Sequence, residues 1–150
     1  MLEDFIEANN LKARVFEVSE EVHSAAKAAA VMEGDAEAVA KSIVLIDSNK
    51  EPLLVILLGK DKIDFAKIKA LLGANDVRLA EPEEVLEITG YEVGGVPPIS
   101  IYGIKTFIDK EVSKKVEVVC GGGDPNHLMR ISIQEILENV EEISIEDVRR

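Results

Sequence analysis

Residues 42–58 read SIVLIDSNKEPLLVILL, and the rest of the fold can be worked out from this stretch. Two nearly continuous apolar runs, residues 42–46 and 53–58, flank a polar segment that contains Asn49 and Pro52. Apolar runs of this length are typical of strands buried on both faces of a sheet, and the polar segment is typical of a turn. We therefore expect a hairpin of two central strands.

Short helices are expected around this hairpin because capping residues recur beside amphipathic stretches. Polar N-cap side chains accept hydrogen bonds from the first helical turn, and glycine ends a helix in the left-handed conformation. The helix that begins near Pro82 should direct Val85, Leu86 and Thr89 toward the core. These signals predict helices in the N-terminal residues, at 25–33 after Ser24, from Asp64 to Gly73, from Pro82 to Gly90, and after a capping box of Ser132 and Glu135.

Shorter apolar segments predict the remaining strands, at residues 14–18, 77–79, 106–108, 116–120, 128–131 and 143–145. Helices and strands are mixed without strict alternation, which is typical of α+β proteins. A chain of 150 residues can bury one core, so we expect a single compact domain over residues 1–150. Its mixed β-sheet should be strongly curved, barrel-like and surrounded by helices, because several short strands must pair with the long hairpin.

The chain carries a formal net charge of −12, which argues against a nucleic-acid partner because phosphate binding depends on Lys and Arg. The acidic residues are concentrated in segments 1–21, 81–92 and 133–150. Segment 59–70 holds Lys60, Lys62, Lys67 and Lys69, so it is either a local basic face or an ordinary solvated helix face.

Membrane and metal chemistry find no support in the sequence. No apolar run reaches the roughly 20 residues that span a bilayer, and the N-terminus lacks the features of a signal peptide. We expect a cytoplasmic protein without a membrane partner. The single cysteine, Cys120, cannot form an internal disulfide, and His23 and His127 do not have the spacing of zinc ligands. We therefore expect no metal and no other cofactor.

The loop Gly94-Gly95-Val96-Pro97-Pro98 is the first candidate for chemistry. Glycines let backbone amides approach a ligand closely, and prolines fix the shape of a loop. Amides held in this way suit a carbonyl oxygen that becomes negative during attack on an ester. The residues alone also allow a rigid connector between a helix and a strand.

Four further features lie beside apolar strands. Lys41 precedes the strand at 42–46 and is either a substrate ligand or a solvated charge. The segment Gly121-Gly122-Gly123-Asp124-Pro125 either lines a pocket or forms a turn. Cys120 follows two valines, which favours a buried and unreactive thiol. His127 is placed either at a pocket rim or in packing.

Taken together, five segments resemble the YbaK and prolyl-tRNA-synthetase-associated editing domain family. The resemblance extends from about Ser24 to Leu137. Its most specific parts are the lysine that opens a strand and the glycine-glycine-x-x-proline element. The segments are Ala40-Lys41-Ser42-Ile43-Val44-Leu45, Leu58 to Asp64, Thr89 to Pro98, Thr106-Phe107-Ile108-Asp109 and Gly121-Gly122-Gly123.

The resemblance implies an aminoacyl-tRNA deacylase that acts in trans, without a metal and without a protein nucleophile. Lys41 would hold the 3′-terminal adenosine of the aminoacyl-tRNA, and the loop Gly94, Gly95, Val96, Pro97, Pro98 would bind the aminoacyl carbonyl. The expected substrate-binding residues are His23, Gly121, Gly122, Gly123, Asp124 and His127. An aminoacyl-tRNA synthetase is a second candidate partner.

Two positions depart from the family. Ser100 stands where glycine is common, and Leu128 stands where some members carry an acidic residue. These departures favour a small amino acid such as alanine or serine over cysteine as the residue removed. The alternative function is a catalytically silent module that binds tRNA or a synthetase.

Overall fold

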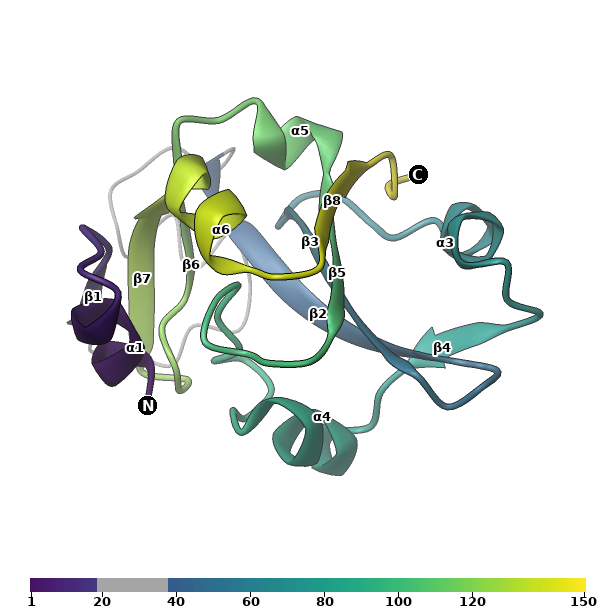
Figure 1. Cartoon of the computed structure of the whole chain (residues 1–150), viewed down its shortest axis with the longest axis horizontal. Coiled ribbons are helices and arrows are strands. Elements are labelled where there is room, and N and C mark those ends of the chain that lie inside the picture. The colour runs from purple at the N-terminus through teal and green to yellow at the C-terminus, as the bar shows by residue number, and fades with distance from the viewer. Residues whose placement is uncertain (19–37) are drawn as a thin grey trace.

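The computed structural model describes residues 1–18 and 38–150 (Figure 1). The central strands cross the middle of the molecule, with α3 and β4 at one end and α1, β1, β7 and β6 at the other. The described elements are α1 (Leu2–Ala8), β1 (Arg14–Glu17), β2 (Ala40–Asp47), β3 (Pro52–Leu58), α3 (Phe65–Leu72), β4 (Val77–Leu79), α4 (Pro82–Thr89), β5 (Lys105–Asp109), α5 (Lys110–Ser113), β6 (Glu117–Gly121), β7 (His127–Ser132), α6 (Ile133–Asn139) and β8 (Ile143–Glu146).

The predicted hairpin is confirmed and forms the centre of a five-stranded sheet with the order β4-β2-β3-β5-β8. β2 pairs antiparallel with β3, in a register that places Ser42 opposite Ile56, and β3 pairs in parallel with β5. Side chains alternate between the faces of a strand, so this sheet carries two cores. Leu54, Ile56 and Leu58 face one core, and the remaining apolar residues of β3 face the other: Leu53, Val55 and Leu57.

A second sheet has the order β1-β7-β6 and lies beside the first. A parallel bridge between Val39 and Val119 connects the start of β2 with β6. The strands therefore wrap around the larger core, although the two sheets do not close into a barrel. This arrangement confirms the α+β class, with mixed and curved sheets surrounded by helices.

Local capping explains the helices. Asp64 accepts hydrogen bonds from the amides of Ala66 and Lys67, and Gly73 ends α3 with φ 66°, as predicted. Ser132 caps α6 by accepting from the amide of Glu135 at 3.1 Å. The other half of the predicted capping box is wrong, because the Glu135 carboxylate instead accepts from the Lys12 amide at 2.7 Å.

The inner face of α4 differs from the prediction at one residue. Val85 and Thr89 are buried, but Leu86 is 48% exposed. Successive helical residues point about 100° apart, so a helix that buries positions 85 and 89 turns position 86 toward solvent. The predicted helix at 25–33, with Ser24 and Gly34, lies outside the described residues. The four-residue helix α5 was not predicted.

Candidate functional site

The two glycine-rich segments meet backbone to backbone. A Cβ atom built on Gly95 would lie 2.4 Å from the Cα of Asp124, and one on Gly121 would lie 2.3 Å from the carbonyl oxygen of Val96. The amide of Gly123 donates a hydrogen bond to the carbonyl of Gly95 at 2.8 Å. No side chain fits between these backbones, and so both segments need glycine for close approach.

The segment at Gly121 forms a turn and also provides one side of the backbone contact with the loop at residues 94–98. It joins β6 to β7, which pair antiparallel, and the Gly122 amide donates to the His127 carbonyl at 3.1 Å. A Cβ atom on Gly122 would lie 2.6 Å from the backbone of His127. The predicted turn is therefore confirmed, and a pocket lined by this segment stays a prediction.

The loop at residues 94–98 offers few backbone donors. Pro97 and Pro98 have no N–H group. The N–H of Gly95 donates a hydrogen bond to the carbonyl of Glu92 at 3.0 Å, and the carbonyl of Gly95 accepts one from the amide of Gly123. Gly94, with φ 93°, is exposed and Val96 is buried. The amides of Gly94 and Val96 take part in neither of these bonds, and they are the candidate donors to a substrate carbonyl.

Lys41 is the second residue of β2 and is partly buried. Its Nζ donates a hydrogen bond to the carbonyl of Gly59 at 3.2 Å. Burial lowers the pKa of Lys41, an effect that the nearby Asp61 opposes and Lys62 reinforces. The bridge between Val39 and Val119 brings the start of β2 alongside β6, and Lys41 and Gly121 each lie two residues beyond that bridge.

Asp124 and His127 form a pair beside the glycine contact. The Nδ1 atom of His127 lies 2.7 and 2.8 Å from the two carboxylate oxygens of Asp124. This hydrogen bond raises the pKa of His127, while burial acts in the opposite direction. The Asp124 backbone packs on Gly95, so the pair is fixed relative to the loop at residues 94–98.

Cys120 is buried, as the sequence predicted, with 2% of its surface exposed. Its thiol donates to the carbonyl of Met129 at 3.6 Å, and burial raises its pKa well above the ordinary value. A neutral, enclosed thiol is a poor nucleophile. His23, the remaining expected ligand, lies outside the described residues.

Two residues that the sequence did not assign to the site flank the loop at residues 94–98. The hydroxyl of Tyr91 donates to the hydroxyl of Ser100 at 2.8 Å, and both side chains are buried. Ser100 has φ 67°, a left-handed conformation that favours glycine. The family's preference for glycine at this position was the signal that could have revealed the conformation.

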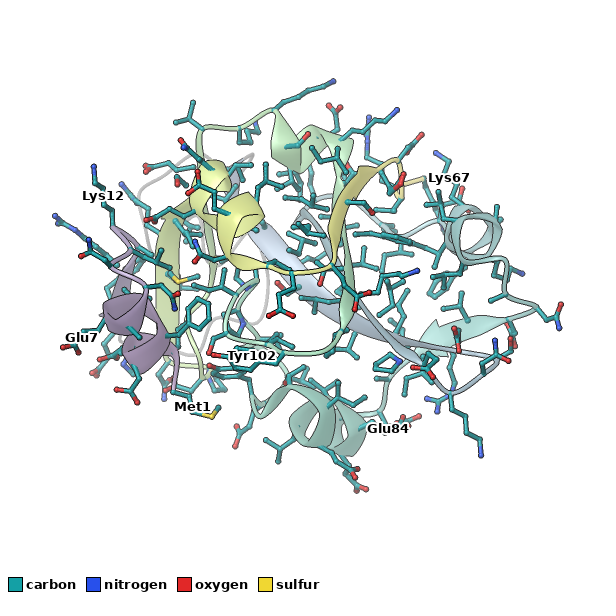
Figure 2. The ribbon with its side chains drawn as sticks, in the orientation of Figure 1. Met1, Glu7, Lys12, Lys67, Glu84 and Tyr102 are labelled. Carbon is teal, nitrogen blue, oxygen red and sulfur yellow. The ribbon has the colours of Figure 1, made fainter. Side chains whose placement is uncertain are left out.

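The lysines of segment 59–70 are partly engaged by the C-terminal residues. Lys67 of α3 lies near the C-terminus in Figure 2, and its Nζ contacts the Asp147 carboxylate at 3.0 Å and the carbonyl of Arg149 at 2.8 Å.

In residues 1–18 and 38–150 no helix is long and apolar enough to cross a membrane, and no group of His, Cys, Asp or Glu side chains is arranged to hold a metal.

A family comparison matches the part of the chain that contains Lys41, the loop at residues 94–98 and the segment at residues 121–127. Residues 19–138 match the aminoacyl-tRNA editing domain family. The proline–tRNA ligase of Halalkalibacterium halodurans is 37% identical over 97 residues, which are 64% of this chain and 17% of that ligase. The chain thus spans about a fifth of the length of the ligases that it matches.

Solved structures share the fold over nearly the whole chain. A candidate trans-editing enzyme for prolyl-tRNA synthetase is 27% identical with a TM-score of 0.89, and the match covers 99% of this chain and 94% of that one. A hypothetical protein is 30% identical with a TM-score of 0.88, and the match covers 99% of both chains.

Proposed function

Because the chain belongs to the aminoacyl-tRNA editing domain family, we propose that it is a trans-acting deacylase that hydrolyses a mischarged small amino acid from tRNA. The observation that carries this proposal is the contact between the glycine segments, which holds the loop at residues 94–98 against Gly121 and Asp124. The structural similarity to a candidate trans-editing enzyme supports action in trans. Translation takes place in the cytoplasm, which is where this activity would be needed.

The ester bond between an amino acid and the tRNA ribose is already activated, so its hydrolysis mainly requires positioning and stabilisation of negative charge. In the proposed mechanism, the amides of Gly94 and Val96 donate to the aminoacyl carbonyl oxygen. Attack by water on the ester carbon turns this oxygen into an oxyanion, and the two donors stabilise that charge until the ester bond breaks, the amino acid leaves and the ribose oxygen of the tRNA takes up a proton. Rigid backbone donors need no reorganisation when the charge forms.

Lys41 has a positioning role in this proposal. Its ammonium, held by the carbonyl of Gly59, would bind the terminal adenosine at the 3′ end of the tRNA. The segment from Gly121 to Asp124, with His127, would enclose the amino acid, and His23 stays a predicted ligand. The matched ligases act on proline and its tRNA, which makes proline tRNA the first substrate to test.

The test is hydrolysis of a panel of mischarged tRNAs by the purified protein. Lys41→Ala should lower kcat/KM by roughly a hundredfold, the scale expected when a positioning contact is lost. Lys105→Ala is a matched control, because Lys105 likewise lies within the first two residues of a strand but its side chain is exposed. Turnover of the Lys41→Ala variant at the wild-type rate, with the fold intact, would contradict the role assigned to Lys41.

The same panel tests the substrate class. We expect activity on alanine or serine attached to tRNA, and activity confined to cysteinyl-tRNA would overturn this assignment. The alternative is a silent module that docks on tRNA or on a synthetase, and it predicts binding without turnover. Binding measured across salt concentrations would then show whether phosphate contacts contribute despite the net charge of −12.

A further inference from the structure

Tyr91 and Ser100 stand at the two ends of the loop at residues 94–98. Tyr91 is 4% exposed and Ser100 is 8% exposed, and the bond between their hydroxyls spans the base of the loop. A buried hydroxyl pair of this kind is costly to break on one side only, because the remaining group has no water to replace its partner. The two ends of the loop are therefore held together by side chains as well as by backbone.

Tyr91 is itself anchored from two directions. Its amide donates to the Thr89 hydroxyl at 3.0 Å, and that hydroxyl donates to the carbonyl of Val85 at 2.7 Å within α4. A Cβ atom added at Gly123 would lie 3.8 Å from the Tyr91 ring, so the ring lies near the second glycine segment. Tyr91 consequently connects the end of α4, the loop at residues 94–98 and Gly123.

Ser100 makes the hydrogen bond with Tyr91 in a backbone conformation that residues with a side chain disfavour. A residue with a side chain disfavours φ 67°, whereas glycine adopts this value freely. The serine hydroxyl accepts the Tyr91 proton, an interaction that glycine could not make. The strained backbone at Ser100 thus coincides with the hydrogen bond that joins the ends of the loop.

We propose that the hydrogen bond between Tyr91 and Ser100 is a brace that positions the amides of Gly94 and Val96 for the substrate carbonyl. Both are positioning residues, since they act through the loop rather than on the substrate. The catalytic consequence rests on the proposed deacylase function. A brace differs from general structural support because it controls the loop even when overall stability is unchanged.

A double-mutant cycle separates these two roles. Tyr91→Phe and Ser100→Ala each leave one buried hydroxyl without its partner, and both single variants should unfold at lower urea concentration than wild type. The double variant removes both hydroxyls, so its urea midpoint should return close to that of wild type. Its kcat should stay roughly tenfold low, with KM within about twofold of wild type, because the substrate contact of Lys41 is retained.

The control is Tyr102→Phe, which removes an equivalent hydroxyl from a side chain that is 71% exposed and is labelled in Figure 2. This variant should match wild type in stability and in kcat. Recovery of both stability and kcat in the double variant would overturn the brace, because the bond would then be structural support alone. A loss of kcat in the Tyr102→Phe control as large as that in the double variant would overturn the brace as well.

Amide hydrogen exchange tests the brace without substrate. The amides of Gly95 and Gly123 make the bonds that define the loop, and they should exchange several-fold faster in the double variant while the amides of α3 are unchanged. Wild-type exchange at both glycines would overturn the brace. If the wild-type protein hydrolyses no mischarged tRNA, the proposed function fails, and exchange still decides whether the brace controls the loop.

Discussion

Substitution of Gly95 by alanine should separate the two glycine segments. The new Cβ atom would lie 2.4 Å from the Cα of Asp124 and 2.5 Å from its amide nitrogen. Both are backbone atoms, so no rotamer change relieves the clash. Restoring an ordinary contact of roughly 3.5 Å requires a movement of about 1 Å. That movement stretches the 2.8 Å bond between the Gly123 amide and the Gly95 carbonyl beyond hydrogen-bonding range.

The cost in stability comes from the backbone clash and from the loss of the hydrogen bond between Gly123 and Gly95. Overpacking costs about 1–3 kcal/mol, and loss of the hydrogen bond adds about 1 kcal/mol, so Gly95→Ala should lower the free energy of unfolding by about 2–4 kcal/mol. A displacement of 1 Å at a positioning group also lowers catalysis by up to about a hundredfold. Urea denaturation measures the first effect, and deacylation kinetics at a temperature where the variant stays folded measure the second.

Gly103→Ala is the matched control for this substitution. Gly103 has φ 72°, but a Cβ atom there meets nothing within 4 Å. Alanine at this position therefore costs only the conformational penalty of about 1–2 kcal/mol and should leave kcat unchanged. A Gly95→Ala variant as stable and as active as wild type would refute the argument from close approach.

Three further predictions concern single groups. Asp124→Asn should lower the pKa of His127, which an NMR titration measures. In the wild-type protein the raised pKa of His127 adds stability that is fully present below about pH 6.5. This added stability is lost as the pH rises through the pKa that His127 has in the folded protein. Cys120→Ala should keep wild-type kcat, and the native thiol should resist a soluble thiol reagent until the protein unfolds. The hydrogen bond from Arg78 lowers the pKa of Glu84 to about 2, so Arg78→Gln should return that pKa toward 4.5, and an unchanged NMR titration would contradict the pairing.

The candidate site could be predicted only in pieces. Lys41, the loop at residues 94–98 and the glycine segment at 121–123 were each identified, but each also had a plain structural explanation that the residues alone could not dismiss. Gly95 and Gly123 are 28 positions apart, and no local pattern records that their backbones touch. The roles of Gly94 and Val96 as candidate donors emerged only when the bonds of Gly95 were known.

The central hairpin, the caps at Asp64 and Ser132 and the helix end at Gly73 could all be predicted without the structure. These features depend on hydrophobic periodicity and on bonds between near neighbours, which a sequence records directly. The bond of Glu135 to Lys12 and the contact between Gly95 and Gly123 could be seen only in the folded structure. Those features depend on contacts between distant segments, whose geometry is set by how the sheets curve and pack rather than by any local preference.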